Sequence, residues 1–278
     1  MDLAYDRFGS GPPLVLLHGV GHRRQAWTPV LDRLTAHREV ICVDFPGFGE
    51  SPPLPPQLSY DVETIIPMLA DFFDRLGLDR PHVAGNSMGG YVSLVLAQQG
   101  LVRSATALSP AGLWTPIVRR WALTMVRSVH RTARHLPPKL AAKLAQTALG
   151  RTLMTGVIFA RPSLLAPRQV LEDMHALITA VGFLPAVAAG EGLLFTGGIP
   201  DIPVTVAWGA RDLIVFRPRA KLVKGLIPQA RLLRLPGCGH VPMSDDPALV
   251  AHVLLTGSDG GDRAEAGGDL PLPEPRSA

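Results

Sequence analysis

One stretch decides the fold of this chain: Val83-Ala84-Gly85-Asn86-Ser87-Met88-Gly89-Gly90. It begins with small or β-branched residues, as a central strand does, and residues 91–97 continue as an apolar helix. A Gly-x-Ser-x-Gly between a strand and a helix predicts a nucleophile elbow, a sharp turn with the serine at its apex. Because such a turn strains the serine backbone, the residues two away on each side must be nearly free of side chains. Gly85 and Gly89 meet this demand.

Five residues are weak evidence alone, because the chain holds 28 glycines among 278 residues and the pattern arises by chance. A Gly-rich turn is the plain alternative, so the rest of the chain has to decide. Hydrophobic residues make up 47% and charged residues 18%, which provides for a large buried core. The length fits one large domain, or a core with an inserted subdomain.

Charge and cysteine content restrict the class of protein. The net charge is +4, and Lys and Arg form no runs interleaved with aromatic residues, so nucleic acid is not an expected partner. The two cysteines, Cys42 and Cys238, are few for this length and favour a reducing compartment. The N-terminus lacks the apolar region of a signal peptide, and no apolar run reaches the roughly 18 residues of a spanning helix. We therefore expect a cytoplasmic protein without a transmembrane segment.

Strand and helix patterns alternate along most of the chain. Short apolar or β-type runs predict strands at residues 3–8, 14–19, 40–44, 82–87, 104–109, 203–209 and 230–235. Helical spacing appears at residues 26–36, 61–76, 218–226 and 247–255. Pro67 lies inside the second of these helices and predicts a kink or a break. Alternation of this kind is typical of an α/β fold with a mainly parallel sheet that is covered by helices on both faces.

The alternation stops once. From residue 111 to 197 the pattern is only helical, with expected helices near residues 116–135, 138–149, 168–181 and 184–189. We interpret residues 1–110 and 198–256 as the core, and residues 111–197 as a helical lid inserted between two strands. The last residues, 257–278, are rich in Gly, Pro and acidic residues without a hydrophobic period, so we expect a disordered tail.

Functional groups of a parallel sheet gather at the carboxyl ends of its strands. Ser87, Asp212 and His240 all lie at strand ends or in the loops just beyond them. Serine needs an adjacent base to become a nucleophile, histidine can take and return its proton, and a carboxylate holds the imidazole in one tautomer. The backbone N–H groups of Val20 and Met88 are the candidate donors for a developing oxyanion. This chemistry requires no cofactor and no metal.

The chain resembles the α/β-hydrolase fold family, in its small, lidded, esterase-like branch. The resemblance covers about residues 3–255 and rests on five motifs in the family's order: His18-Gly19-Val20-Gly21, Asp44-Phe45-Pro46-Gly47-Phe48-Gly49-Glu50-Ser51, Gly85-Asn86-Ser87-Met88-Gly89-Gly90, Gly209-Ala210-Arg211-Asp212 and Gly239-His240. It implies an eight-stranded, mostly parallel sheet with a helical cap. It also implies Ser87 as nucleophile, Asp212 as acid and His240 as base, with Val20 and Met88 forming the oxyanion hole. One departure is the basic run His22-Arg23-Arg24, which leaves the substrate-side role of these residues open.

The first functional hypothesis is a serine hydrolase that cleaves a carboxylic ester, lactone or thioester through an acyl-enzyme. Apolar residues suggest a mostly hydrophobic small-molecule substrate, and the candidates for binding it are Trp27, Trp114, Trp121 and Phe183. A C–C bond hydrolase with the same triad is one alternative, although Arg23 and Arg24 replace the small residues usual there. A ligand-binding or accessory protein that kept the fold is the other. The sequence does not fix the oligomeric state.

Three further residues have structural interpretations. We expect Asp44 to hold the loop around Pro46, His18 to hold the oxyanion loop, and Cys238 to be a packed neighbour of His240.

The lid carries a charge pattern of its own, because no Asp or Glu occurs between Asp79 and Glu172. At 100° per residue, one side of the helix at residues 116–135 is basic; its members are Arg120, Arg127, Arg131 and Arg134. A solvated face is one interpretation, and weak contact with anionic lipid or an acidic partner is the other.

Overall fold

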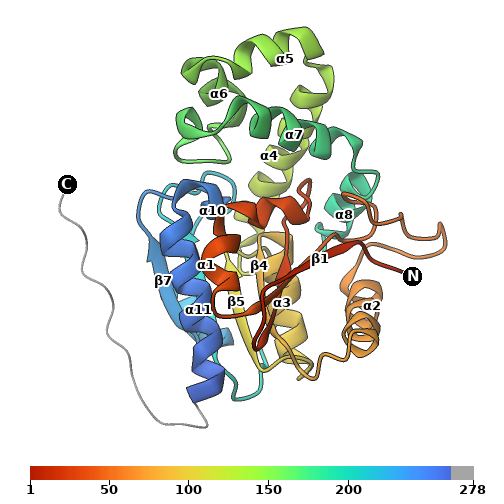
Figure 1. Cartoon of the computed structure of the whole chain (residues 1–278), viewed down its shortest axis with the longest axis vertical. Helices are drawn as coiled ribbons and strands as arrows, with labels where there is room; N and C mark the ends of the chain where they lie inside the picture. Colours follow the sequence, from red (N-terminus) through yellow and green to blue (C-terminus); the bar gives the residue numbers. More distant parts are fainter. Residues whose placement is uncertain (264–278) are drawn as a thin grey trace.

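The computed structural model of the chain describes residues 1–263, which form a seven-stranded sheet covered by helices (Figure 1). The strand order is β1-β3-β2-β4-β5-β6-β7, and every pairing is parallel except that of β1 with β3. The strands are β1 (Tyr5–Phe8), β2 (Pro13–Leu17), β3 (Glu39–Val43), β4 (His82–Asn86), β5 (Ser104–Leu108), β6 (Val204–Gly209) and β7 (Arg231–Leu235). All seven coincide with the runs predicted from the residues. The expected eighth strand came only from the family resemblance and was wrong for residues 1–263, whose sheet has seven strands.

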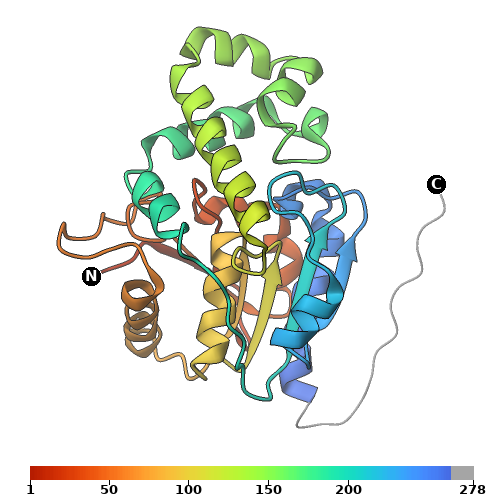
Figure 2. The same ribbon diagram turned by 180° about the vertical axis from the view of Figure 1, so that it is seen from behind.

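Helices cover both faces of the sheet, as the alternating pattern predicted (Figures 1 and 2). One face carries α2 (Val62–Arg75), α3 (Met88–Gln98) and α9 (Ala220–Leu226). The other carries η1 (Arg24–Val30), α1 (Leu31–Thr35), α10 (Pro242–Asp245) and α11 (Pro247–Arg263). The helix α3 is apolar on every side and almost wholly buried, so it holds the elbow rigidly against the sheet. The helix α2 runs through Pro67 as a single element, so the break considered from the sequence is absent from residues 62–75.

The lid is inserted between β5 and β6 and rises from the carboxyl end of the sheet (Figure 1). Its helices are α4 (Pro116–His135), α5 (Pro138–Ala145), α6 (Ala148–Thr155), η2 (Pro162–Leu164), α7 (Pro167–Thr179) and α8 (Phe183–Ala189). The single helix expected at residues 138–149 was wrong, because Thr147 accepts a hydrogen bond from the Gly150 N–H and starts a new helix there. Within residues 1–263 no single helix has the length and apolar character to cross a membrane. Only the pair α7 and α8, bent by 71°, has them when taken together.

The last helix continues past the point where disorder was expected. Prediction ended it near residue 255 and began a disordered tail at residue 257, yet α11 extends to Arg263. Close packing at Gly257 explains the error. A Cβ on Gly257 would lie 2.2 Å from Thr106 Oγ1, so only glycine lets α11 lie so close to the sheet. Arg38 also donates to Ser258 Oγ at 3.1 Å. The remainder of the expected tail lies outside the described residues.

Candidate active site

The elbow has the strained geometry that its glycines predicted. Ser87 has φ 55° and ψ −112°, a region that costs an L-residue about 1–3 kcal/mol and persists only when the surroundings impose it. Its N–H donates to the Leu108 carbonyl at 2.9 Å. A Cβ on Gly85 would lie 2.1 Å from the Gly89 carbonyl oxygen, and a Cβ on Gly89 would lie 2.1 Å from that of Leu17. Both positions therefore exclude any side chain, as the sequence indicated.

Asp212 and His240 meet across the ends of two neighbouring strands. The His240 Nδ1 lies 2.9 Å from Asp212 Oδ2, and both side chains are buried. The other carboxylate oxygen, Oδ1, accepts hydrogen bonds from the N–H groups of Ile214 and Val215, each at 2.9 Å. Because a carboxylate only accepts, His240 donates from Nδ1 and keeps the lone pair on Nε2. The arrangement is that of a general base whose orientation and tautomer are fixed.

Asn86 joins the elbow to the histidine loop, a role that the sequence reasoning missed. Its Nδ2 donates to the His240 carbonyl at 2.9 Å and to the Leu108 carbonyl at 3.2 Å. The residue beside the serine thus holds the backbone of the base. The Nδ1 of His240 is hydrogen-bonded to Asp212, and no hydrogen bond joins Ser87 to the Nε2 of His240. Such bonds are often long in sites without substrate. Ser87 is only 8% exposed.

The loop after β2 lies directly beside the serine. A Cβ on Gly19 would meet the Cβ of Ser87 at 3.3 Å, so the loop backbone passes along the elbow. Val20 is the next residue of this loop. Met88 is the first residue of α3, where an N–H has no acceptor within the helix. The backbone N–H groups of Val20 and Met88 stay the predicted oxyanion donors.

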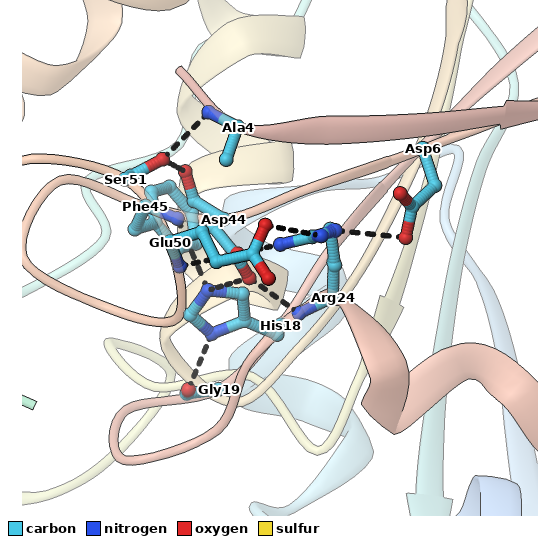
Figure 3. A network of polar contacts seen from close by, with 9 residues as sticks. All are labelled: Ala4, Asp6, His18, Gly19, Arg24, Asp44, Phe45, Glu50 and Ser51. Carbon is cyan, nitrogen blue, oxygen red and sulfur yellow. Dashed lines mark hydrogen bonds and ion pairs between the residues drawn. The ribbon is translucent and has the colours of Figure 1, made fainter. Parts of the chain in front are cut away.

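Arg24, Asp44 and His18 form a buried polar network behind the oxyanion loop (Figure 3). Arg24 contacts Asp44 at 2.5 Å, Asp6 at 2.7 Å and Glu50 at 2.8 Å, and its own N–H donates to Asp44 Oδ1 at 2.6 Å. Asp44 Oδ2 also accepts from the Glu50 N–H at 3.0 Å. The interpretation of Asp44 as a residue that holds the loop around Pro46 is confirmed by these contacts. The sequence left open whether Arg24 acts on the substrate side. The structure instead pairs its guanidinium with three carboxylates of this network.

His18 connects this network to the oxyanion loop. Its Nε2 accepts from the Phe45 N–H at 3.0 Å, so its Nδ1 carries the proton and donates to the Gly19 carbonyl at 2.8 Å. A neutral imidazole is required for this pairing. Burial lowers the pKa of His18 to about 4, although the nearby Asp44 carboxylate raises it. The geometry confirms that His18 holds the oxyanion loop.

The His18 shift predicts a loss of stability in mild acid. Because the folded pKa of about 4 lies below the ordinary 6.5, the unfolded chain binds the proton first as the pH falls. The stability that depends on a neutral His18 is fully present above pH 6.5 and is lost as the pH falls toward 4. The loss amounts to about 3 kcal/mol in unfolding free energy. Urea unfolding of the wild type and His18→Asn at neutral and mildly acidic pH checks this. The variant should start less stable and lose less on acidification; equal losses would contradict the assignment.

Asp245 clamps the histidine loop to the lid, and no local pattern in the sequence indicated it. This buried carboxylate accepts from the N–H groups of Gly239 at 2.7 Å, Ala160 at 3.0 Å and Arg161 at 2.8 Å. The His240 N–H also donates to the lid carbonyl of Ile158 at 2.8 Å. Two of the clamped residues lie more than 80 positions away in the chain, so no local pattern could reveal the contact.

Asp245→Ala is expected to weaken both stability and activity. Three N–H groups lose their acceptor at once, which costs about 2–3 kcal/mol in unfolding free energy. Because the His240 loop then loses its position, ester turnover should fall about 10- to 100-fold. The control is Asp246→Ala, since the Asp246 carboxylate accepts from the Leu249 N–H at the start of α11, at 3.0 Å, and holds no lid residue. That change should cost about 1 kcal/mol and leave turnover unchanged. A matching loss of turnover in both variants would count against the clamp.

A cavity of about 360 Å³ opens beside Met88. The helix α3 contributes Met88, Tyr91 and Val92, and α8 contributes Ala186 and Ala189. Its lining is mainly apolar, with carboxylates at one side; the remaining members are Phe45, Phe48, Tyr60, Asp61, Val62, Glu63, Ile65, Gly192, Leu193 and Leu194. Its size falls in the usual range for small-molecule pockets.

None of the four aromatic residues proposed to bind substrate lines this cavity. Trp27 was wrong as a substrate contact, because it is fully buried with η1, α11 and the opposite face of the sheet. Trp114 supports the wall, since its Nε1 donates to the Leu193 carbonyl at 2.9 Å. Phe183 stacks on His130 in the lid, with ring centroids 4.3 Å apart. Trp121 is 42% exposed and stacks on Phe216 outside the cavity. The single helix expected at residues 26–36 is a 3-10 helix that holds Trp27, followed by the short α1, and the sequence did not show which face of the sheet Trp27 packs against.

The remaining reactive groups are buried or dispersed. Cys42 and Cys238 are free thiols in the core, and burial raises the pKa of Cys238 to about 12, so it packs beside His240 as expected. Among residues 1–263, no three His, Cys, Asp or Glu side chains gather as metal ligands.

Comparison with known proteins identifies the family. The model of the alpha/beta hydrolase fold family matches residues 12–247, which is most of the chain. The chain belongs to this family. The alpha/beta hydrolase assignment agrees with the parallel sheet, the elbow and the inserted lid described above.

Individual relatives of this alpha/beta hydrolase are distant. It is 32% identical to a dihydrolipoyllysine-residue acetyltransferase component of the acetoin cleaving system from Pseudomonas putida, over 88% of this chain and 63% of that protein. It is 27% identical to a pimeloyl-[acyl-carrier protein] methyl ester esterase from Aeromonas hydrophila, over 91% of this chain and 98% of the relative. Among solved structures, a bacterial membrane phospholipase A superposes with a TM-score of 0.74 and 27% identity, over 94% of this chain and 83% of its own.

Proposed function

We propose that this alpha/beta hydrolase cleaves a carboxylic ester, lactone or thioester of a mostly hydrophobic small molecule through an acyl-enzyme on Ser87. The observation that carries the proposal is the 2.9 Å bond between His240 Nδ1 and Asp212, in a loop that Asn86 ties at 2.9 Å to the elbow, where Ser87 is held at φ 55°. A buried carboxylate that orients an imidazole next to a strained serine fits nucleophilic acyl transfer. The relative named as a methyl ester esterase supports the choice of an ester bond.

The proposed reaction has two halves. His240 Nε2 takes the proton of Ser87 as the oxygen attacks the carbonyl carbon, and the N–H groups of Val20 and Met88 stabilise the oxyanion. The leaving alcohol or thiol takes the proton from His240, which leaves an acyl group on Ser87. Water then attacks the acyl-enzyme as His240 takes its proton; the bond from the acyl carbon to the Ser87 oxygen breaks, His240 returns the proton to that oxygen, and the acid is released.

The cavity beside Met88 is the proposed place of the acyl group. Met88, the residue after the serine, lines it, and apolar side chains of α3 and α8 form much of its wall. Its volume of about 360 Å³ accommodates a short or medium acyl chain better than a long one.

Nitrophenyl esters of increasing acyl length test this function. We expect hydrolysis of short and medium esters, with kcat/KM falling for long chains. Ala189→Phe should shift the optimum to shorter chains by narrowing the cavity. Ala188→Phe is the matched control, because the neighbouring Ala188 is exposed and should leave the optimum unchanged. Folded protein that hydrolyses none of the esters would reject the function, whereas an unshifted optimum in Ala189→Phe would reject only the cavity assignment.

A further inference from the structure

The outer end of the lid presents leucines to solvent. The helices α5 and α6 form the end of the molecule farthest from the sheet (Figures 1 and 2). On α6, Leu149 is 70% exposed and Leu153 is 72% exposed. They are four residues apart and therefore share one face of the helix. Leu164 of the adjoining η2 is also exposed, at 75%. We call Leu149 and Leu153 the leucine tip.

Packing explains why the leucine tip faces outward. The helix α6 turns its small residues inward, and Gly150 and Thr155 are the buried ones. A Cβ on Gly150 would lie 2.0 Å from the Leu144 carbonyl oxygen, so α6 approaches this part of the lid too closely to turn a leucine inward there. An amphipathic helix normally buries its leucines. Here the apolar face lacks a partner within the described chain, and adjacent exposed apolar side chains of this kind mark interaction surfaces.

The surroundings of the leucine tip are strongly basic. Residues 116–164 contain no Asp or Glu but nine cationic residues, which are Arg119, Arg120, Arg127, Arg131, Arg134, Lys139, Lys143, Arg151 and Arg161. Lys139 and Lys143 lie on α5, which packs against α6, and both are exposed one turn apart. Arg127 is neutralised by an ion pair with Glu191 at 2.5 Å, further down the lid.

We propose that the leucine tip and the lysines of α5 dock reversibly on an anionic lipid bilayer. Leu149 and Leu153 would enter the boundary between headgroups and acyl chains, and Lys139 and Lys143 would meet lipid phosphates. The absence of acids from residues 116–164 argues for an anionic occupant, and the exposed Glu172 of the adjoining α7 is paired with Arg168 and Arg23. A second copy of this chain would bring the same cations face to face and be repelled. The sequence predicted only a basic side on α4. The leucine tip adds the apolar side chains that insertion into a bilayer requires.

Vesicle co-sedimentation with the catalytically silent Ser87→Ala protein tests the proposal independently of hydrolysis. We expect binding to phosphatidylcholine vesicles that contain phosphatidylglycerol, negligible binding to phosphatidylcholine alone, and weaker binding as salt rises. Leu149→Gln/Leu153→Gln should lower the partition coefficient by at least about tenfold. Lys139→Glu/Lys143→Glu should lower it by about thirtyfold or more.

The helix α9 supplies matched controls at the far side of the core. It also exposes one leucine and two lysines, so Leu222→Gln and Lys221→Glu/Lys224→Glu repeat the chemistry away from the lid. These variants should bind vesicles like the parent. Unchanged circular dichroism and thermal midpoints establish that all variants fold. The proposal is overturned by equal binding to neutral and anionic vesicles, by no binding, or by equal losses in the tip and control variants. It is also overturned if the tip variant abolishes a dimer instead of vesicle binding.

Discussion

Ser87→Ala is expected to lower kcat for ester hydrolysis by about 10⁴-fold or more. The change removes the attacking oxygen and leaves the elbow in place, since its geometry comes from Gly85, Gly89 and the hydrogen bond of the Ser87 N–H. KM should change little, because the cavity beside Met88 is untouched. A fluorophosphonate probe supplies a second measurement. It should label the wild type and not the variant, and absence of labelling in folded wild-type protein would favour a binding protein over an enzyme.

Two further variants separate the nucleophile from its surroundings. Ser93→Ala is the matched control, because Ser93 is a buried serine of the same helix whose hydroxyl donates to the Gly89 carbonyl at 2.8 Å. It should keep its label and its turnover within a few-fold. Asp212→Asn should lower kcat by about 10⁴-fold, because an amide can hold the imidazole in the wrong tautomer. Substantial turnover in Ser87→Ala, or loss of label in Ser93→Ala, would contradict the assignment of Ser87.

Arg24→Met is expected to have the largest effect on stability, about 3–5 kcal/mol in unfolding free energy. The guanidinium contacts three carboxylates, and the Asp44 carboxylate is fully buried. Methionine fills a similar volume but leaves Asp44 charged and without its cation. Urea unfolding measures the loss. The double variant Arg24→Met/Asp44→Asn should recover part of it, because the unpaired charge is gone.

An exposed ion pair provides the control for Arg24. Arg7 contacts Glu39 at 2.9 Å on the edge of the sheet, and both side chains reach solvent. Arg7→Met should therefore cost no more than about 1 kcal/mol. If the two arginine variants were equally stable, the buried network would contribute nothing special and its role behind the oxyanion loop would have to be abandoned.

Features set by neighbouring residues were predictable from the sequence. The strain at Ser87 follows from glycines two positions away, and each strand follows from its own apolar run. Asp212 and His240 were found because parallel strands end at one edge of the sheet, so that residues far apart in sequence converge there. Their 2.9 Å hydrogen bond agrees with that reasoning.

Features set by tertiary packing were not predictable. Trp27 has the helical spacing of a packed residue, but the sequence does not say which face of the sheet it covers. Gly257 was read as part of a disordered tail, whereas close contact with Thr106 keeps it in a helix. The clamp by Asp245 depends on the lid folding back over the core, which no local pattern encodes. The role of Arg24 was left open because the run at residues 22–24 is basic, and its three carboxylate partners come from segments that the sequence does not show to be neighbours.

The lid is fastened to the catalytic machinery at two opposite ends. Gly182 donates to the Gly47 carbonyl at 3.0 Å near the oxyanion loop, and Ile158 and Asp245 hold the His240 loop on the other side. Lifting the whole lid would therefore pull on the base and on the loop beside the oxyanion loop together. Because the lid residues Gly182 and Ile158 bond to these two loops, movement of the lid and the geometry of the site are coupled.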